Sequence, residues 1–283
     1  MSTRWACLVG QPVAQSLSPT LHNAAFRAAG VDATYGLCET SSADLAAAVE
    51  RLRSPLCLGA NVTAPHKQAV LPLLDDVSAA ARALGAVNTV VPSGGRLYGD
   101  NTDALGLARW LRLEGIDVGG RPALVLGAGG AARAAVWALA ELGAARVSIL
   151  NRTPQRAAAV VVALAPFHPA TRLGCAELEV AARPAAEACA VVINATSLGH
   201  HGRAPSVHPS WYSPGSVGIE LVYNPPLTGF MQAARAAGAR VENGLGMLIH
   251  QAALAFERWT GQPAPLDAYT AAAAGAASGM VRV

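Results

Sequence analysis

One residue type stands out among the groups that could take part in acid–base chemistry. Of the 21 basic residues in the 283-residue chain, only Lys67 is a lysine. An arginine guanidinium keeps its proton at any working pH, whereas a lysine ammonium can give its proton up. Lys67 ends the segment NVTAPHK, which follows the apolar run LCLGA. Because open α/β sheets bind ligands at the carboxyl ends of their strands, we interpret Lys67 as a candidate catalytic residue.

A carboxylate that could act together with this lysine is Asp103, in the segment GDNTDALG. The segment begins a predicted helix with Asn101 or Thr102 as its N-cap. A carboxylate in the first turn of a helix is also stabilised by the helix dipole. The local sequence therefore leaves a catalytic and a structural explanation of Asp103 open.

A glycine-rich turn, GAGGAA at residues 127–132, separates the predicted strand ALVL from a long predicted helix. It fits the pattern G-x-G-x-x-[G/A], in which small residues allow a tight turn and bring the start of the helix close to a pyrophosphate. A tight turn without a ligand would have the same sequence, but the position between strand and helix favours a dinucleotide site. The predicted contacts are Gly127, Ala128, Gly129, Gly130 and Ala131.

The segment after the next predicted strand distinguishes between the two nicotinamide cofactors. A site for NAD usually has Asp or Glu about 20 residues after the glycine-rich turn, where it accepts a hydrogen bond from the ribose 2′-hydroxyl. Here the segment is NRTPQR, and no carboxylate lies between Glu141 and Glu177. Arg152 and Arg156 instead offer cationic donors that suit a 2′-phosphate. The sequence therefore predicts NADP(H), although arginines on a solvated helix start would look the same.

The elements that must position these groups alternate between short apolar runs and alanine-rich stretches, which predicts an α/β fold with mainly parallel sheets. Ser93-Gly94-Gly95 between two β-rich runs predicts a hairpin. Ser18 and Ser42 are the predicted N-caps of the first two helices.

A fresh series of strands after residue 119 predicts two domains, 1–104 with 240–283 and 105–239. The other predicted strands are 5–10, 33–39, 56–63, 146–150, 190–196 and 216–223, and the other predicted helices begin at 19, 44, 101, 244 and 266.

Composition and spacing exclude several classes of protein. The longest apolar stretch has 11 residues, 157–167, and includes Pro166, whereas a bilayer helix needs about 20. The arginines are scattered, which argues against a nucleic-acid partner. The five cysteines are widely spaced without a CxxC pair, and the histidines lack metal-ligand spacing, so we expect neither disulfides nor a metal. The first residues lack the apolar core of a signal peptide, so we expect a cytoplasmic protein.

Nine ordered motifs make the chain resemble the shikimate dehydrogenase (shikimate/quinate dehydrogenase) family from about residue 8 to 262. The resemblance implies a two-domain enzyme, with an α/β substrate domain and a Rossmann-type NADP-binding domain. It implies reduction of 3-dehydroshikimate to shikimate with NADPH, in the shikimate pathway of aromatic amino acid biosynthesis, and it is compatible with a homodimer. The motifs are GQPVAQSLSPTLHN, NVTAPHK, GAVNT, GDNTDALG, GAGGAA, NRTPQR, NATSLG, VYNPPLT and NGLGMLIHQAALAFERWTG.

The resemblance also implies roles for individual residues. Lys67 and Asp103 match the catalytic pair. Ser16 and Ser18 match the hydroxyls that hold the substrate carboxylate, with Tyr223 nearby. The matching contacts to the ring hydroxyls and the reacting oxygen are Thr63, Asn88 and Gln251, and the matching cofactor contacts beyond the glycine-rich turn are Asn151, Arg152, Thr153, Arg156, Thr196 and Gly244.

Two positions depart from the family pattern, because His200 replaces a common methionine and Glu220 replaces a frequent aspartate. Other functions also remain open. One is an NAD-dependent quinate/shikimate dehydrogenase, which the missing acidic residue and Ser18 disfavour. An aminoshikimate-type dehydrogenase is another. The third is a non-catalytic NADP-binding regulator, which the Lys67 and Asp103 pair disfavours.

Overall fold

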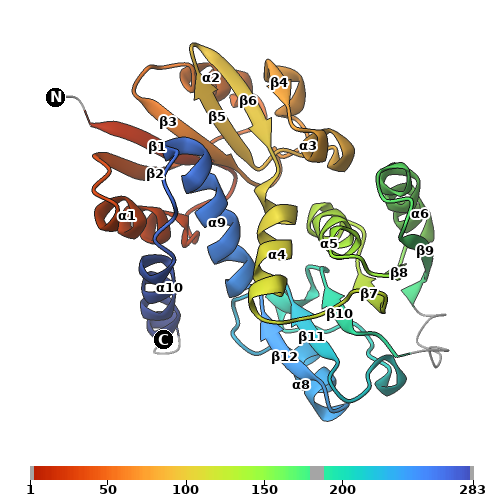
Figure 1. The fold of residues 1–283 in the computed structure, drawn as a ribbon. Coiled ribbons are helices and arrows are strands. Elements are labelled where there is room, and N and C mark those ends of the chain that lie inside the picture. The colour runs from red at the N-terminus through yellow and green to blue at the C-terminus, as the bar shows by residue number, and fades with distance from the viewer. Residues whose placement is uncertain (1–2, 179–187, 281–283) are drawn as a thin grey trace. The chain divides into compact units, whose positions relative to one another are not determined.

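The computed structural model describes residues 3–178 and 188–280, and for residues 200, 201 and 277–280 it describes the backbone alone. The chain forms two compact units (Figure 1). The first unit consists of Met1–Gly106 and Ile249–Val283, and the second of Leu107–Leu248. The boundaries fall within two helices, α4 (Thr102–Leu113) and α9 (Leu245–Thr260).

The first unit contains a six-stranded sheet in the order β2-β1-β3-β5-β6-β4. β1 is parallel to both of its neighbours, whereas β5 is antiparallel to β3 and to β6. The strands are β1 (Arg4–Gly10), β2 (Ala33–Glu39), β3 (Cys57–Val62), β4 (Asp76–Val77), β5 (Thr89–Ser93) and β6 (Arg96–Asp100). The helices are α1 (Ser18–Ala28), α2 (Leu45–Arg51), α3 (Ala79–Leu84), α9 and α10 (Leu266–Met280), with one 3-10 turn at Leu71–Leu73.

This strand order gathers polar groups at one edge of the sheet. β1 and β3 are parallel, so the segments that follow them begin at the same edge. β5 runs the other way, and its first residue, Thr89, pairs with Asn61 near the end of β3. Thr89 also pairs with Asp100, the last residue of β6, which leads into α4. Lys67, Asn88 and Asp103 therefore follow or precede strands at a single edge.

Five of the six strands of the first unit, and the hairpin, agree closely with the sequence-based prediction, which missed β4 and α3. The predicted N-caps of α1 and α2 were wrong. α1 begins at Ser18 rather than after it, with Leu17 as the N-cap residue, because Ser16 Oγ already accepts the Ser18 N–H at 3.2 Å. Asp44 rather than Ser42 is the N-cap residue of α2, and its N–H donates to Ser41 Oγ at 3.3 Å.

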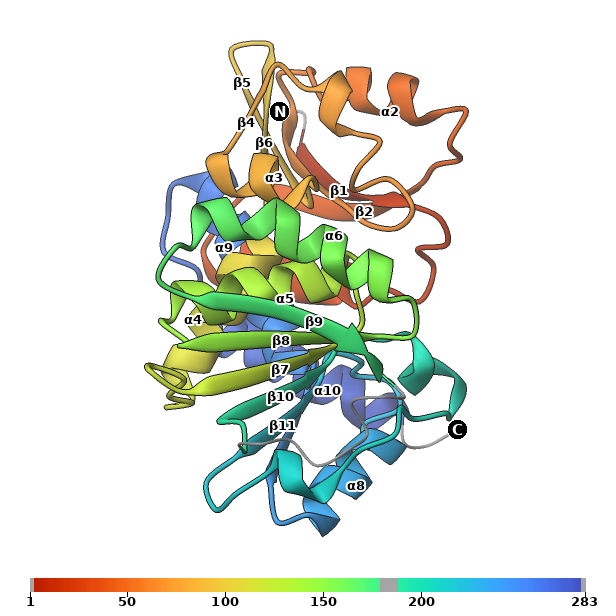
Figure 2. The same ribbon diagram turned by 90° about the vertical axis from the view of Figure 1, so that its right-hand side faces the viewer.

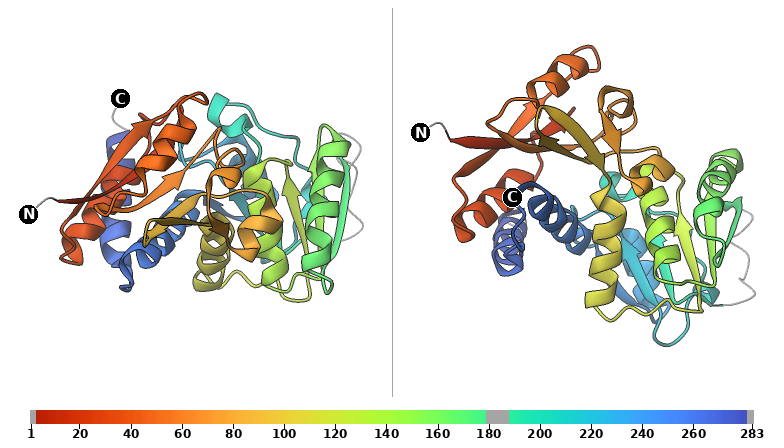
Figure 3. Two further views of the ribbon diagram at one scale, coloured as in Figure 1. Left: turned by 90° about the horizontal axis from the view of Figure 1, so that it is seen from above. Right: turned by 45° about the horizontal axis from the view of Figure 1, so that its top comes forward.

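The core of the first unit follows from helix periodicity. Leu45, Ala48, Val49 and Leu52 recur at helical spacing and are buried, so α2 presents one apolar face to the sheet. Three of them join a cluster with the apolar side chains of β1 and β3. α1 and α10, drawn red and dark blue, lie side by side although they are far apart in the sequence (Figures 1 and 3).

The second unit contains a sheet in which every pair of neighbours is parallel, in the order β12-β11-β10-β7-β8-β9. Figure 2 shows β9, β8, β7, β10 and β11 in this order. The strands are β7 (Pro122–Leu126), β8 (Arg146–Asn151), β9 (Arg172–Glu177), β10 (Val191–Asn194), β11 (Val217–Glu220) and β12 (Arg240–Asn243). The helices are α5 (Gly130–Glu141), α6 (Pro154–Leu164) and α8 (Gly229–Ala236), with 3-10 turns at Ala165–Phe167, Leu198–His201 and Pro209–Trp211.

This order is that of the Rossmann fold, 3-2-1-4-5-6, read from β9 to β12. The chain moves outward from β7 to β9 and then returns to place β10 on the other side of β7. Dinucleotides bind at this switch point, outside the carboxyl ends of the two central strands. Among the described residues, no helix is long and apolar enough to cross a membrane.

The second boundary between the units lies later in the chain than residue 240, where the sequence analysis places it. β12 was not expected from the sequence, and it pairs in parallel with β11. Residues 240–243 therefore extend the sheet of the second unit, and the chain returns to the first unit only within α9.

Candidate active site and dinucleotide site

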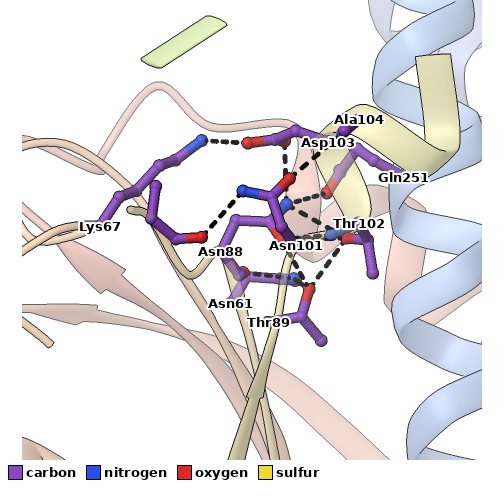
Figure 4. A network of polar contacts seen from close by, with 10 residues as sticks. Asn61, Lys67, Asn88, Thr89, Asn101, Thr102, Asp103, Ala104 and Gln251 are labelled. Carbon is purple, nitrogen blue, oxygen red and sulfur yellow. Dashed lines mark hydrogen bonds and ion pairs between the residues drawn. The ribbon is translucent and has the colours of Figure 1, made fainter. Parts of the chain in front are cut away.

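Lys67 and Asp103 form an ion pair in the first unit, with Lys67 Nζ 2.6 Å from Asp103 Oδ2 (Figure 4). Lys67 lies in the turn after β3, and Asp103 is the second residue of α4. The lysine side chain is 31% exposed and the aspartate side chain 14%. The pair is thus shielded by protein on the carboxylate side and accessible to a ligand on the ammonium side.

Asn88 holds the second oxygen of the same carboxylate. Its Nδ2 donates to Asp103 Oδ1 at 2.8 Å and lies 3.4 Å from Gln251 Oε1. Asn88 is 2% exposed and Gln251 is 8% exposed. Both carboxylate oxygens of Asp103 are therefore engaged, one by the amide and one by the ammonium, which fixes the plane of the carboxylate.

Neighbouring polar groups fix the orientation of the Asn88 amide. Its Oδ1 accepts the Thr102 N–H at 2.7 Å, which determines which end of the amide faces Asp103. Asn61 Nδ2 donates to the main-chain carbonyl of Asn88 at 3.2 Å and to Thr89 Oγ1 at 3.2 Å, and so holds the backbone beside this amide. Sequence reasoning missed Asn61 and Thr102 as supports, although both lie in segments that it singled out.

His66 and Val87 hold the segment that carries Lys67. His66 is 1% exposed, and its Nε2 donates to the Thr40 carbonyl at 2.7 Å. The Val87 N–H donates to the Lys67 carbonyl at 2.8 Å. These two hydrogen bonds hold the backbone around Lys67 in place, so its side chain extends toward Asp103 from a fixed position.

Ser16 and Ser18 lie together at the start of α1. Ser16 Oγ donates to Ser18 Oγ at 3.1 Å and accepts the Ser18 N–H at 3.2 Å. The N-cap residue, Leu17, makes no side-chain cap, and the first turn carries no acidic residue. The helix dipole therefore adds to the two hydroxyls in favouring a carboxylate, a contribution that sequence reasoning did not include.

Thr63 and Gly106 show how closely the segments of the first unit approach one another. Thr63 follows β3 and is half-buried, and a Cβ added at Gly10 would collide with its methyl group. A Cβ added at Gly106 in α4 would lie 2.6 Å from Gln251 Cα in α9. Gln251 reaches Asn88 because α4 and α9 touch at this glycine.

The glycine-rich turn of the second unit lies at the switch point of its sheet. Gly127 has a φ of +107°, which only glycine adopts without strain, and an added Cβ would lie 3.0 Å from the Ala195 carbonyl oxygen after β10. Gly129 is the N-cap residue of α5, and no side chain caps the helix. Gly129, Gly130 and Ala131 are exposed. The first N–H groups of α5 are thus accessible to a pyrophosphate.

The segment after β8 presents two exposed guanidinium groups. Asn151 Nδ2 donates to the Thr153 carbonyl at 2.8 Å and shapes the turn. Arg152 and Arg156 make no ion pair with any residue that the structure describes. The donor set therefore suits a phosphate at this position. The parallel pairing of β8 and β9 also sets Glu177 opposite Asn151, which the linear distance to Glu177 did not suggest.

Glu220 connects the remaining candidate cofactor segments, and its role was not predicted. It is completely buried, and its carboxylate accepts from Asn194 Nδ2 at 2.8 Å, from Thr228 Oγ1 at 2.9 Å and from the Val222 N–H at 3.2 Å. Asn194 Oδ1 in turn accepts from Thr196 Oγ1 at 2.8 Å. The carboxylate therefore ties the segments after β10 and β11 together.

Tyr223 and Gly244 also belong to the second unit. Burial raises the pKa of the Tyr223 phenol above its ordinary value, so it stays a neutral hydrogen-bonding group. At Gly244, an added Cβ would collide with the Leu221 carbonyl group, so no side chain fits. The side chain of His200 lies outside the described part of the chain.

Three sequence models of known families match successive parts of the chain. They are described as shikimate dehydrogenase substrate binding domain over residues 8–90, shikimate / quinate 5-dehydrogenase over residues 112–201, and shikimate 5'-dehydrogenase C-terminal domain over residues 244–273. The shikimate dehydrogenase (NADP(+)) of Moorella thermoacetica is 45% identical over 98% of this chain and 96% of its own length. The chain belongs to the shikimate dehydrogenase family.

Solved structures of the family agree with this assignment. Shikimate 5-dehydrogenase from Thermus thermophilus, in complex with NADP(H) and shikimate, is 38% identical, with a TM-score of 0.85 over 96% of this chain and 99% of that one. Shikimate 5-dehydrogenase from Listeria monocytogenes, in complex with shikimate and NAD, is 32% identical, with a TM-score of 0.89 over 95% and 96%. The predicted α/β class and the predicted family are thereby confirmed.

Proposed function

We propose that this protein catalyses the reversible, NADPH-dependent reduction of 3-dehydroshikimate to shikimate, a step of aromatic amino acid biosynthesis. The observation that carries the proposal is the Lys67–Asp103 ion pair of 2.6 Å, whose carboxylate Asn88 also holds. Membership of the shikimate dehydrogenase family supports the assignment of the substrate.

In this proposal, Lys67 and Asp103 act on the oxygen of the ring carbonyl. NADPH supplies the hydride when it is bound. The carbonyl oxygen then gains negative charge, which the Lys67 ammonium stabilises and neutralises by donating a proton. Asp103 holds the ammonium in place through the ion pair of 2.6 Å. The reverse reaction uses the same groups, with Lys67 as the base.

We assign substrate binding to polar groups of the first unit. Ser16 and Ser18 would bind the substrate carboxylate, aided by the N-terminus of α1. Thr63, Asn88 and Gln251 would contact the ring hydroxyls and the reacting oxygen. Since hydroxyl groups bind a carboxylate less strongly than a bidentate arginine does, we expect moderate affinity for the substrate.

We assign NADP(H) binding to the switch point of the second sheet. The N–H groups at the start of α5 would hold the pyrophosphate, and Arg152 and Arg156 the 2′-phosphate. Asn151, Thr153, Thr196 and Gly244 would line the rest. The reaction consumes charged, membrane-impermeant reactants, so we also propose a cytoplasmic location.

An assay of two substrates against two cofactors tests this function. Initial rates would be measured for shikimate and for quinate, each with NADP⁺ and with NAD⁺. We expect shikimate with NADP⁺ to be the fastest combination. Faster turnover of quinate with NAD⁺ would replace the proposal with a quinate/shikimate dehydrogenase, and NADPH binding without any turnover would indicate a regulator.

A further inference from the structure

A second group of reactive side chains lies in the first unit, where α2 covers β1 and β2. Cys7 and Cys38 come from these neighbouring parallel strands and line the same cavity. Cys7 is buried, whereas Cys38 is half-exposed. The two thiols therefore adjoin one cavity but differ in their access to solvent.

A cation from α2 completes the cluster. The Nη2 atom of Arg51 donates to Cys38 Sγ at 3.3 Å, and Thr40 Oγ1 lies 3.5 Å from the same sulfur. A cavity of about 290 Å³ opens beside the sulfur, with Trp5, Ala48 and Leu52 among its walls. The cavity has room for a small molecule next to Sγ.

These contacts favour a thiolate at Cys38. The neighbouring Cys7 thiol, the Thr40 hydroxyl, and the hydrogen bond and charge of Arg51 lower the pKa of Cys38 to about 5 despite its partial burial. The neighbouring Cys38 and burial raise the pKa of Cys7, and burial raises that of the nearby Cys57 to about 12. Cys38 is thus the thiolate of this group, and Cys7 and Cys57 stay protonated.

We propose that Cys38 is a covalent modification site, at which a thiolate held by Arg51 attacks small hydroperoxides that enter the adjoining cavity. The sulfur attacks one peroxide oxygen, so that an S–O bond forms as the O–O bond breaks. Cys38 is oxidised by two electrons to a sulfenic acid, and the departing hydroxide or alkoxide takes up a proton from water. The site is separate from Lys67 and Asp103, and it stands whether or not the proposed enzyme activity is correct.

The chain contains its own reference thiol, because Cys175 on β9 is exposed. At pH 6 a thiol with a pKa of about 5 is about 90% thiolate, compared with about 0.3% for an ordinary thiol. The lower basicity of the thiolate reduces its intrinsic reactivity about 25- to 55-fold. We therefore expect Cys38 to react about five- to tenfold faster than Cys175 at pH 6 and more slowly than Cys175 at pH 9.

The experiment alkylates the intact protein with limiting iodoacetamide at pH 6 and pH 9, and peptide mass spectrometry gives the rate at each cysteine. A parallel sample receives hydrogen peroxide and then dimedone, which traps sulfenic acids. We expect the dimedone adduct at pH 6 mainly on Cys38. Labelling of Cys38 that is no faster than that of Cys175 at pH 6, or an adduct found mainly on Cys175, would overturn the proposal.

Matched variants test the part played by the cation. Arg51→Gln should slow both reactions of Cys38 at pH 6 at least threefold. Arg27→Gln makes the same change at the end of α1 and should leave the rates unaltered. Cys38→Ser should remove both adducts at this position while the labelling of Cys175 persists. Equal rates in the Arg51 and Arg27 variants would show that the guanidinium does not activate the thiol.

Discussion

The Lys67 ammonium has three N–H donors, and Asp103 Oδ2 accepts one of them at 2.6 Å. The remaining donors are available to a substrate oxygen. A single lysine among 21 basic residues was enough to draw attention to this position. Asp103 had two explanations from the sequence, because a carboxylate also suits a helix start. The contact between the two side chains now favours the catalytic explanation.

Lys67→Ala should lower kcat about 100- to 10,000-fold, the usual contribution of a positioned acid or base. NADPH binding should stay within about twofold, because the proposed cofactor contacts lie in the second unit. Steady-state kinetics and fluorescence titration with NADPH would measure the two effects. Lys67→Arg keeps the charge but cannot transfer a proton, so we expect it to be almost as inactive. Turnover within a few-fold of the wild type in the alanine variant would show that Lys67 is not catalytic.

Arg152→Ala should raise the KM for NADPH about 10- to 100-fold, the value of a lost charged hydrogen bond. The KM for NADH should change little, because NADH lacks the 2′-phosphate. Arg172→Ala removes another exposed arginine of the second unit, at the start of β9, and serves as the control. An equal loss for both cofactors would contradict a 2′-phosphate site at Arg152.

At the scale of elements, His22 on α1 shows how burial links stability to pH. His22 is completely buried, stacks on Tyr35 with ring centroids 4.4 Å apart and lies 3.0 Å from the Tyr269 hydroxyl. Burial lowers the pKa of His22 to about 3. Between about pH 6.5 and 3 the unfolded chain binds a proton at His22 that the folded chain does not, so stability falls as the pH falls through this window.

We expect this proton to cost about 2 kcal/mol of folding free energy at pH 5 relative to pH 7.5. His22→Gln removes the titrating group, so the folding free energy of the variant should not fall by this amount between pH 7.5 and pH 5, although the variant is less stable overall. Urea unfolding of both proteins at the two pH values measures the difference. If the difference in unfolding free energy between wild type and variant is the same at both pH values, protonation of His22 does not cause the loss of stability.

The sequence predicted most strands because apolar runs and turn residues act locally. It missed β12, a short strand without an apolar pattern that forms only because β11 offers a free edge. It also missed the placement of Glu177 beside Asn151 and the contacts of Glu220, since both arise from strand pairing and from segments distant in the chain. The glycine-rich turn and Arg152 and Arg156 were named from local motifs, whereas the substrate residues and the other cofactor residues were named from family resemblance. Their roles and the predicted homodimer stay predictions.

For the whole molecule, the chain passes from the first unit to the second in α4 and returns in α9. The candidate cofactor groups lie in the second unit, and most candidate substrate groups lie in the first. This division predicts that NADPH alone and shikimate alone protect different parts of the backbone from hydrogen exchange.

Hydrogen exchange followed by mass spectrometry tests this division. NADPH should slow exchange in the peptides around Gly127 and Asn151, and shikimate in those around Ser16, Asn88 and Gln251. A digest without ligand provides the reference. Protection by shikimate that is confined to the second unit would contradict the assignment.

The contact between Gly106 and the backbone of Gln251 limits which sequences can carry this fold. Alanine is favoured over glycine in a helix by about 1 kcal/mol, so most helical glycines tolerate it. At Gly106 an alanine methyl would lie 2.6 Å from Gln251 Cα, and α9 would have to move away with the amide that faces Asn88. In a saturation library selected for growth, position 106 should therefore be a helical site at which alanine is depleted and glycine alone survives.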